Sequence, residues 1–194
     1  IAPDDIASMV NTSGARDVIG HGTHVAGIVA ARGPFHGVAP DVRLLSAKVF
    51  YESGYADLDG ILAGLTWARY ERGADVISMS LGTGSGDYGT SILTEAVEKV
   101  VADGATVTVA AGNEGPGRGT LSIPGDAPNA ITVGAIDRDL TLAAFSSRGK
   151  PGMAKPDLNL LVTLDVLLAE GSVARAARRL RLSPSAMSRA LTRL

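Results

Sequence analysis

The stretch ATVTVAAGN, residues 105–113, decides the fold class of this chain. Alternating threonine and valine residues over 105–111 predict a β-strand, and Gly104 before it predicts a left-handed cap that ends a helix. Residues 90–103 place their apolar side chains at helical spacing, so a helix runs directly into this strand. A helix that leads straight into a buried strand is typical of α/β proteins.

The alternation of helix and strand extends outward in both directions. Upstream, residues 42–50 and 75–81 predict strands, and residues 58–68 between them repeat apolar side chains at helical spacing. Downstream, residues 131–136 predict a further strand. The sequence therefore predicts an α/β fold, a parallel sheet flanked by helices on both faces.

The composition excludes several classes of protein and site. The chain of 194 residues has no cysteine, which excludes disulfide bonds, thiolate catalysis and cysteine-ligated zinc. No apolar run reaches the roughly 18 residues that a spanning helix needs, so we expect no membrane contact. The first residues, IAPDDIASMV, lack an initiator methionine and the features of a signal peptide. We therefore expect the chain to be the interior of a longer protein.

Charge and glycine content divide the chain near Asp157. Residues 1–157 contain 12 basic and 18 acidic residues, a net charge of −6. Residues 158–194 contain six arginines and two acidic residues, a net charge of +4, and only one glycine lies beyond Gly152. The sequence therefore predicts two domains, 1–157 and 158–194, with different partners.

Candidate site residues follow the ends of two predicted strands, where function collects in parallel sheets. Ser80, Leu81 and Gly82 leave one strand end, and Ala110, Ala111, Gly112 and Asn113 leave the next. An asparagine at this edge can donate a side-chain N–H to a developing oxyanion. The alternative is an asparagine chosen for a left-handed turn.

A histidine between two glycines opens a second candidate site, in VIGHGTHVAGIVAA, residues 18–31. Its place at the start of an apolar helix suits His21 to the role of catalytic base better than to packing. His24 and His36 offer a metal site as an alternative, although neither has a carboxylate or cysteine at ligand spacing. We expect no metal and no cofactor, and we expect His24 to pack as an ordinary helix residue.

Several motifs together resemble those of the subtilisin-like serine peptidases, in order and in spacing. They are GHGTHVAGIVAA, GVAPDVRLLSAKVF, GADVISMSLG, VTVAAGNEGP, NAITVGAIDRD and FSSRG. The resemblance covers residues 1–157 and implies an α/β endopeptidase that acts on polypeptides through an Asp-His-Ser triad. His21 corresponds to the general base and Asn113 to the oxyanion-hole donor. The substrate-binding residues that it implies are Ser80, Leu81, Gly82, Ala110, Ala111 and Gly112.

Two members of that triad have no convincing counterpart. APDDI, at residues 2–6, resembles the stretch that follows the family's catalytic acid, and Asp17 is interpreted as a solvated loop carboxylate or a residue near the cleft. The family's nucleophile motif, Gly-Thr-Ser-Met-Ala, does not occur. We expect a structural role for Ser146 and Ser147, and Ser185 lacks the preceding glycine. The domain is therefore predicted to be truncated at both ends, inactive as it stands, and to expose apolar surface at its cleft edges.

The arginine-rich end of the chain predicts three short helices. Leucines of 160–168 share one helical face, Ser172 caps a helix through Leu180, and Ser183 with Pro184 begins a third helix. Three helices with a tight turn between the last two form a helix-turn-helix pattern. The alternative is an arginine-rich surface on an ordinary helical hairpin.

Residues 157–194 resemble the start of a LysR-type transcriptional regulator. The resemblance implies weak, salt-dependent binding of DNA through a recognition helix at 183–193. Its expected DNA contacts are Ser185, Ser188, Arg189, Arg178 and Arg181, the last two at the phosphate backbone. Three hypotheses follow from the two resemblances: a working serine peptidase, a DNA-binding module and a non-functional chimera. These peptidases are mostly exported and these regulators cytoplasmic, so the sequence assigns no localisation.

Overall fold

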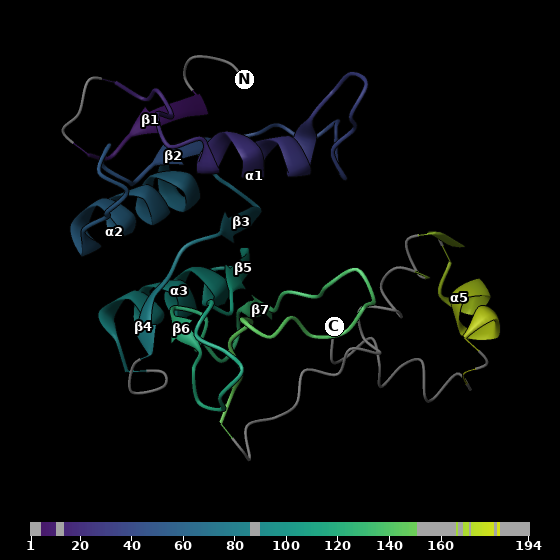
Figure 1. Cartoon of the computed structure of the whole chain (residues 1–194). Coiled ribbons are helices and arrows are strands. Elements are labelled where there is room, and N and C mark those ends of the chain that lie inside the picture. Colours follow the sequence, from purple (N-terminus) through teal and green to yellow (C-terminus); the bar gives the residue numbers. More distant parts are fainter. Residues whose placement is uncertain are drawn as a thin grey trace. The chain divides into compact units, whose positions relative to one another are not determined.

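The computed structural model describes residues 5–10, 14–85, 90–150, 166, 169–170, 172–180 and 182. The chain forms two compact units, Ile1–Pro151 and Gly152–Leu194. The elements of the first unit (Figure 1) are β1 (Ile6–Ser8), α1 (His21–Ala30), β2 (Ser46–Lys48), α2 (Leu58–Thr66), the π-helical turn η2 (Trp67–Glu71), β3 (Val76–Met79), β4 (Thr83–Ser85), α3 (Ile92–Ala102), β5 (Thr106–Ala110), β6 (Ser122–Ile123) and β7 (Ile131–Val133). Within the described ranges, no helix is long and apolar enough to cross a membrane.

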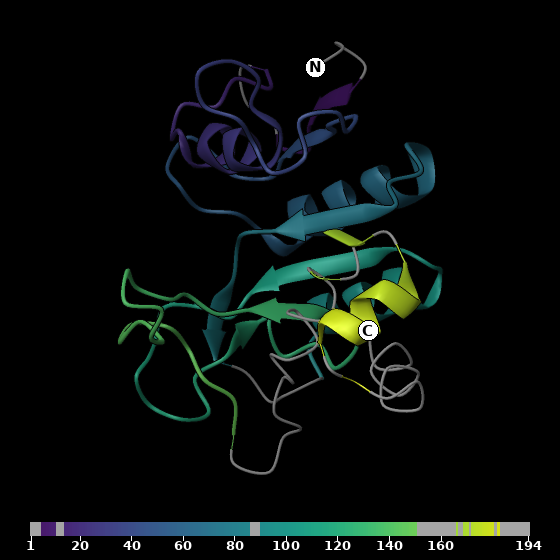
Figure 2. The ribbon, with the colours of Figure 1, turned by 90° about the vertical axis from the view of Figure 1, so that its right-hand side faces the viewer.

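The strands of this unit confirm the predicted α/β class. Strands β3, β5 and β7 form a parallel sheet in that spatial order, and Figure 2 shows their arrows side by side. Strands β1 and β2 form a separate parallel pair, and β4 and β6 pair antiparallel. β2 is shorter than the strand predicted over 42–50, because only its residues 46–48 face β1 in a ladder.

The core lies on one face of the three-stranded sheet. Side chains of β3 and β5 alternate, so that Ile77 and Met79 lie beside Val107 and Val109 and point inward together. Residues of α2 and α3 complete this core: Leu65, Leu93, Val97 and Val100. We expected helices on both faces, but in the described part of the chain only this face is covered by α2 and α3. On the opposite face, Val76 is 64% exposed, and Ile131 and Val133 are also exposed.

Side-chain caps fix the ends of the core helices. The Asp57 carboxylate accepts the Gly60 N–H at the start of α2, at 2.7 Å, and the Ser91 hydroxyl accepts the Thr94 N–H at the start of α3, at 3.0 Å. Gly104 follows α3 with φ of 94°, which confirms the predicted left-handed cap. Asp and Ser at these positions satisfy N–H groups that have no partner within the helix.

A buried carboxylate holds the start of β1. Asp5 Oδ2 accepts a hydrogen bond from Arg43 Nε at 3.1 Å, and Oδ1 accepts from Arg43 Nη2 and from Arg72 Nη2, the latter at 2.8 Å. The guanidinium of Arg43, followed by that of Arg72, lowers the pKa of Asp5 to about 2. One carboxylate thus ties β1 to the segments that precede β2 and β3.

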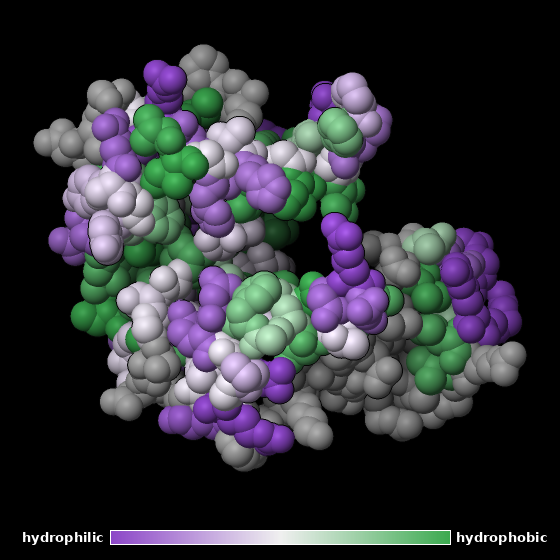
Figure 3. Space-filling view, in the orientation of Figure 1, coloured by the Kyte–Doolittle hydropathy of each residue, from purple (hydrophilic) through white to green (hydrophobic). Residues whose placement is uncertain are grey.

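Helix α1 is apolar in sequence, yet none of its residues is buried. Ile28 is 56% exposed, and the loop that follows exposes Phe35 and Val38 almost fully. Figure 3 shows hydrophobic residues interspersed with hydrophilic ones over one face of the molecule. Apolar side chains are therefore exposed at α1 and its following loop, while apolar exposure at the cleft edges stays a prediction.

The described part of the second unit centres on α5 (Val173–Arg179). The Ser172 hydroxyl accepts the Arg175 N–H, which confirms the cap and the helix predicted over 172–180. Ala176 and Val166 are buried and pack with Ala177, Leu180 and Leu182. The helix predicted over 183–193 lies outside the described residues.

Candidate active site

His21 is the first residue of α1, and its ring reaches the end of β3. Nε2 of His21 lies 2.8 Å from the backbone oxygen of Ser80, the residue that follows β3. The ring is exposed, so a ligand from solvent has access to it. A helix start and a strand end that lie 59 residues apart in sequence thus meet at one edge of the sheet.

The contact with Ser80 fixes which nitrogen of the neutral His21 ring carries hydrogen. A backbone carbonyl oxygen can only accept a hydrogen bond, so Nε2 must be the donor and Nδ1 is the basic nitrogen. In a Ser-His-Asp triad the arrangement is the reverse: the acid binds Nδ1–H, and Nε2 takes the proton of the serine. In this structure the neutral His21 ring therefore has its proton on the nitrogen that faces a backbone carbonyl, and not on the nitrogen that a triad acid would bind.

A single carboxylate organises the turn that presents His21. Asp17 Oδ1 accepts the N–H groups of Ile19 and Gly20, at 3.1 and 2.8 Å. Asp17 Oδ2 accepts both the N–H and the hydroxyl of Thr23, each at 2.7 Å. Gly20 itself has φ of 84°, a left-handed conformation that glycine adopts without strain. The turn around His21 is thereby fixed on both sides of the histidine.

These four hydrogen bonds correct the interpretation of Asp17 as a merely solvated loop carboxylate. Its side chain is exposed, but the Thr23 hydroxyl, then the Thr23 and Gly20 N–H groups, lower the pKa of Asp17 to about 2. Asp17 is ionised at neutral pH and lies against Gly22, where an added Cβ would meet Oδ2 at 3.6 Å. It acts on the backbone around His21 and, in the contacts described, not on the ring.

Asn113 follows β5 by three residues and is exposed. The register pairs Met79 with Val109, so the ends of β3 and β5 lie side by side at the same edge of the sheet. The left-handed turn at this edge is made by Gly112, with φ of 108°, and not by Asn113. The alternative interpretation, an asparagine chosen for a left-handed turn, is therefore wrong.

A second carboxylate, that of Glu114, organises the turn that presents Asn113. Glu114 Oε2 accepts the Asn113 N–H at 2.9 Å, the Ser122 hydroxyl at 2.8 Å and the Ser147 hydroxyl at 2.9 Å. The Ser147 oxygen in turn accepts the Glu114 N–H at 3.0 Å. The Ser122 hydroxyl, followed by that of Ser147, lowers the pKa of Glu114. Three segments of chain thus converge on one carboxylate oxygen.

The two predicted substrate-binding segments meet through Ser122. The Ser122 N–H donates to the Ala111 carbonyl at 2.9 Å, and an added Cβ on Gly82 would meet Ser122 Cβ at 2.9 Å. Strand β6, which begins at Ser122, also pairs with β4 just beyond Gly82. Ser122 therefore contacts Gly82 of one predicted segment and Ala111 and Gly112 of the other. Ser80, Leu81, Gly82, Ala110, Ala111 and Gly112 stay the predicted substrate-binding residues.

The candidate nucleophile serines are either buried or lie outside the described residues. Ser146 is fully buried and its hydroxyl accepts the Ala135 N–H at 3.0 Å, while Ser147 is buried against Glu114. The structural role expected for both agrees with these contacts. Ser185 and Asp4 lie outside the described residues.

The other two histidines are exposed. His24 was expected to pack within its helix, and this is wrong, because α1 as a whole has no buried residue. His36 lies in the exposed loop after α1. Within the ranges that the structure covers, no three histidine, aspartate or glutamate side chains gather as metal ligands would.

Sequence reasoning missed the residues that support the two turns. Thr23, Glu114 and Ser122 were not singled out, although the first two stand inside the motifs HGTH and GNEG. The available indication was a polar residue within two positions of the candidate base and of the candidate oxyanion donor. Ser122 has no such indication, because its contacts come from segments distant in sequence.

Of the predicted DNA-contacting residues, the structure describes only Arg178. It is exposed on α5. Ser185, Ser188, Arg189 and Arg181 lie outside the described residues.

Comparison with known families gives two matches that follow one another along the chain. Residues 4–161 match the Subtilase family of peptidases. Residues 158–194 match the lysR family of bacterial regulatory helix-turn-helix proteins.

Individual relatives agree with the first match. The chain is 44% identical to Subtilisin DY of Bacillus licheniformis over 135 residues, which cover 67% of this chain and 48% of that protein. It is 39% identical to Serine protease AprX of Bacillus subtilis over 176 residues, which cover 78% of this chain and 40% of that protein. The chain thus spans less than half the length of these two relatives.

A solved structure agrees as well. Sphericase superposes with a TM-score of 0.66 at 34% sequence identity, over 77% of this chain and 53% of that one. The family match, the relatives and the parallel sheet concern the same residues. Through residues 4–161 the chain belongs to the subtilase family, and its end is similar to the helix-turn-helix of lysR-type regulators.

Proposed function

We propose that the first unit carries the peptide-binding cleft of a serine endopeptidase, with His21 as general base and Asn113 as oxyanion donor. The observation that carries this proposal is the 2.8 Å contact between His21 Nε2 and the Ser80 oxygen. This contact brings the imidazole to the edge of the sheet where β5 leads into Asn113. Base and donor then serve one reacting carbonyl.

The chemistry assigns a different task to each of the two residues. In peptide-bond hydrolysis the base takes the proton of the nucleophile, and the donor stabilises the negative oxygen that forms on the carbonyl carbon. A donor of this kind contributes about 10²- to 10³-fold to turnover, a magnitude measured on the asparagine of subtilisin itself. Asn113 supports this role because its side chain is exposed while its backbone is held by Glu114.

The substrate in this proposal is an extended polypeptide. Ser80, Leu81 and Gly82 follow β3 and precede β4, so their backbone groups can pair with a peptide as an added strand would. Gly112 is closely surrounded by the Ser122, Glu114 and Ser147 side chains, so its neighbourhood leaves no space for a substrate side chain. The chain is therefore proposed to bind peptides chiefly through backbone hydrogen bonds.

We further propose that these 194 residues bind peptide without cleaving it. The sequence holds no Gly-Thr-Ser-Met-Ala motif, and Ser146 and Ser147 are buried. Nε2 of His21 donates to Ser80 in this structure, so the ring can act as general base at Nε2 only after that hydrogen bond breaks. Loss of the serine alone reduces turnover about 2 × 10⁶-fold in subtilisin.

The test uses the whole chain with a serine-directed fluorophosphonate and, separately, with a fluorescent casein substrate. We expect neither labelling nor release of fluorescence above that of His21→Ala. Labelling at a single site that disappears in Ser185→Ala, together with casein cleavage, would overturn the proposed inactivity and make Ser185 the nucleophile.

A second function is favoured by the match of residues 158–194 to the lysR family. We propose that this segment binds double-stranded DNA weakly, through arginines that contact phosphates. Arg175, Arg178 and Arg179 are all exposed on α5. Binding is expected near the non-specific range, about 10⁻⁴ to 10⁻⁶ M at physiological salt, and to weaken as salt rises. A chain that binds neither peptide nor DNA would leave the non-functional chimera as the remaining hypothesis.

A further inference from the structure

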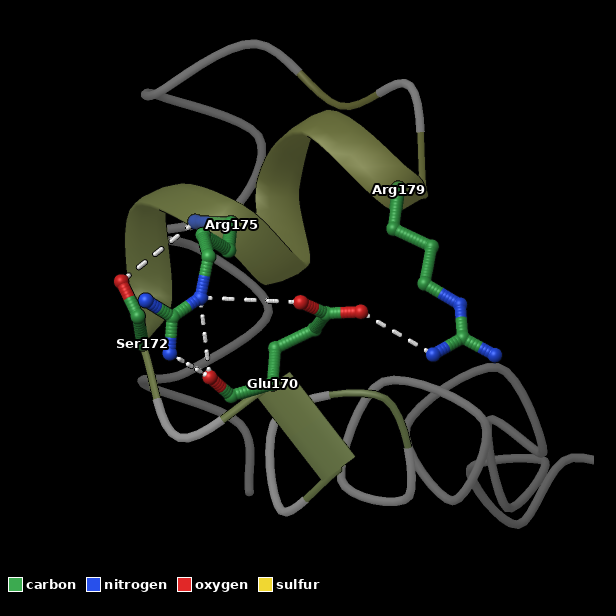
Figure 4. A network of polar contacts seen from close by, with 4 residues as sticks. All are labelled: Glu170, Ser172, Arg175 and Arg179. Atoms are coloured by element: carbon green, nitrogen blue, oxygen red, sulfur yellow. Dashed lines mark hydrogen bonds and ion pairs between the residues drawn. The ribbon is translucent and has the colours of Figure 1, made fainter.

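The three arginines of α5 have different surroundings, although all of them are exposed. Figure 4 shows that the Glu170 carboxylate lies between two of them. Its Oε2 is 3.6 Å from Arg175 Nε, and its Oε1 is 3.0 Å from Arg179 Nη1. One carboxylate therefore forms ion pairs with two guanidinium groups, one through each oxygen.

Arg175 is held by a second group of the same residue. Its Nε donates to the Glu170 backbone oxygen at 3.1 Å, and its Nη2 donates to that oxygen too. The guanidinium is thus fixed at three contacts, one of which is an ion pair. Glu170 precedes the helix cap Ser172, so these contacts also fasten the start of α5.

Arg178 differs from both neighbours. It stands three residues after Arg175, which places the two on adjacent positions of the helix surface. Its side chain is exposed, and it has no ion pair with any other residue that the structure describes. Of the three α5 arginines, it is the one whose charge is offset by no carboxylate among the described residues.

We propose that Glu170 restrains Arg175 and Arg179 in ion pairs that a DNA phosphate has to displace, so that Arg178 is the principal phosphate contact of α5. This inference rests on the DNA-binding function proposed above. Exposed ion pairs are weak and screened by salt, so phosphates can displace them, but each displacement subtracts from the affinity. Glu170 thereby limits the charge that α5 presents to DNA.

The alternative is that Glu170 only stabilises the start of α5. Under that alternative, all three arginines contribute alike to binding, and removal of the Glu170 charge acts only through the net charge of the chain. The two cases separate when Glu170→Gln is compared with Glu95→Gln. Glu95 is an exposed glutamate of α3 that forms no ion pair with another described residue, and its substitution changes the net charge by the same amount.

The experiment measures fluorescence anisotropy of a labelled duplex of mixed sequence with the full chain, over a series of salt concentrations. Glu170→Gln is expected to bind about 3- to 10-fold more tightly at low salt. The slope of log affinity against log salt steepens by about 0.9 for each arginine that becomes free to contact a phosphate. Arg178→Ala is expected to bind about 5-fold more weakly and to lose about 0.9 of that slope. Arg175→Ala and Glu95→Gln stay within about twofold of the parent chain.

The outcomes distinguish this inference from the function on which it rests. If the parent chain shows no salt-dependent binding, the DNA-binding function fails. If the parent chain binds but Glu170→Gln behaves as Glu95→Gln does, the inference is overturned. Should circular dichroism show that Glu170→Gln loses helix, the arginine variants decide: equal losses in Arg175→Ala and Arg178→Ala overturn it, and a loss in Arg178→Ala alone supports it.

Discussion

The turns that present His21 and Asn113 are built on the same principle with different reach. In each, one ionised carboxylate collects hydrogen bonds around a candidate catalytic residue. The partners of Asp17 all lie within six residues of it. Two partners of Glu114 come from elsewhere, Ser122 at eight residues and Ser147 at 33. The first turn is local, and the second depends on the tertiary fold.

This difference determines how each turn responds to a change in the packing of the fold. The hydrogen bonds of the His21 turn involve only residues 17–23, so this turn can form without any other segment of the chain. The Asn113 turn forms only when β5, β6 and the segment of Ser147 are already packed together. A change in packing therefore disturbs Asn113 and leaves the turn of His21 intact.

The largest loss of stability is expected at Gly112, where the Asn113 turn leaves no space for a Cβ atom. In Gly112→Ala, the new Cβ would meet Ser122 Oγ at 2.0 Å and Glu114 Oε2 at 2.6 Å, at a residue with φ of 108°. We expect the free energy of unfolding, measured by urea denaturation, to fall by about 3 kcal/mol or more.

Gly27→Ala is the matched control for that change. Gly27 lies inside α1 with open space around its Cβ position, and alanine there is expected to raise stability by about 0.5–1 kcal/mol. Equal effects of the two substitutions would show that the Asn113 turn is not close-packed.

An intermediate effect is expected from Ser147→Ala. The buried Ser147 hydroxyl both donates to Glu114 Oε2 and accepts the Glu114 N–H, so alanine removes two hydrogen bonds between distant segments. We expect the free energy of unfolding to fall by about 1–2 kcal/mol. Ser53→Ala, at an exposed loop position, is expected to change it by less than about 0.5 kcal/mol. If Ser147→Ala changed stability as little as Ser53→Ala does, the Asn113 turn would not depend on its hydrogen bonds with distant segments.

The smallest effect on stability belongs to the local turn, where pH is the sharper probe. The folded pKa of Asp17 is lowered from 3.8 to about 2, so its hydrogen bonds are complete above pH 3.8 and are lost as the pH falls through 2. The amide signals of Gly20 and Thr23 are expected to follow a transition centred near pH 2 by NMR.

Thr23→Val sharpens this test by removing the strongest of the Asp17 contacts. It is expected to raise the pKa of Asp17 toward 3.8 and to leave the Asn113 turn unchanged. Thr141→Val is the control, because Thr141 makes the corresponding contact with a different carboxylate, that of Asp137. A transition already centred near 3.8 in the parent chain would contradict the role given to Asp17.

The same distinction between local and distant contacts explains which features the sequence predicted. The end of α3 at Gly104, the cap at Ser172 and the position of His21 at a helix start depend on neighbouring residues, and the structure has them as expected. Short strands such as β2 ended earlier than predicted because pairing with another strand, and not apolar content, sets their length.

Other features could not be predicted because they depend on what packs nearby. His24 was expected to be packed, yet α1 meets no core in the described residues, so its apolar pattern gives no burial. The residue with positive φ is Gly112 and not Asn113. Composition alone does not decide which of two adjacent residues adopts this conformation. Ser122 joins both substrate-binding segments through contacts that only the folded chain creates.

We propose that His21 and Asn113 share one peptide-binding edge of the sheet. The most direct measurement is an NMR titration of the ¹⁵N-labelled full chain with an unlabelled, uncharged tetrapeptide amide. We predict saturable shifts of the Asn113 side-chain amide, of the Leu81 and Gly82 backbone amides and of the His21 ring, with one common dissociation constant. Titration without shifts at Asn113 and His21, or with unrelated dissociation constants for the two residues, would contradict it.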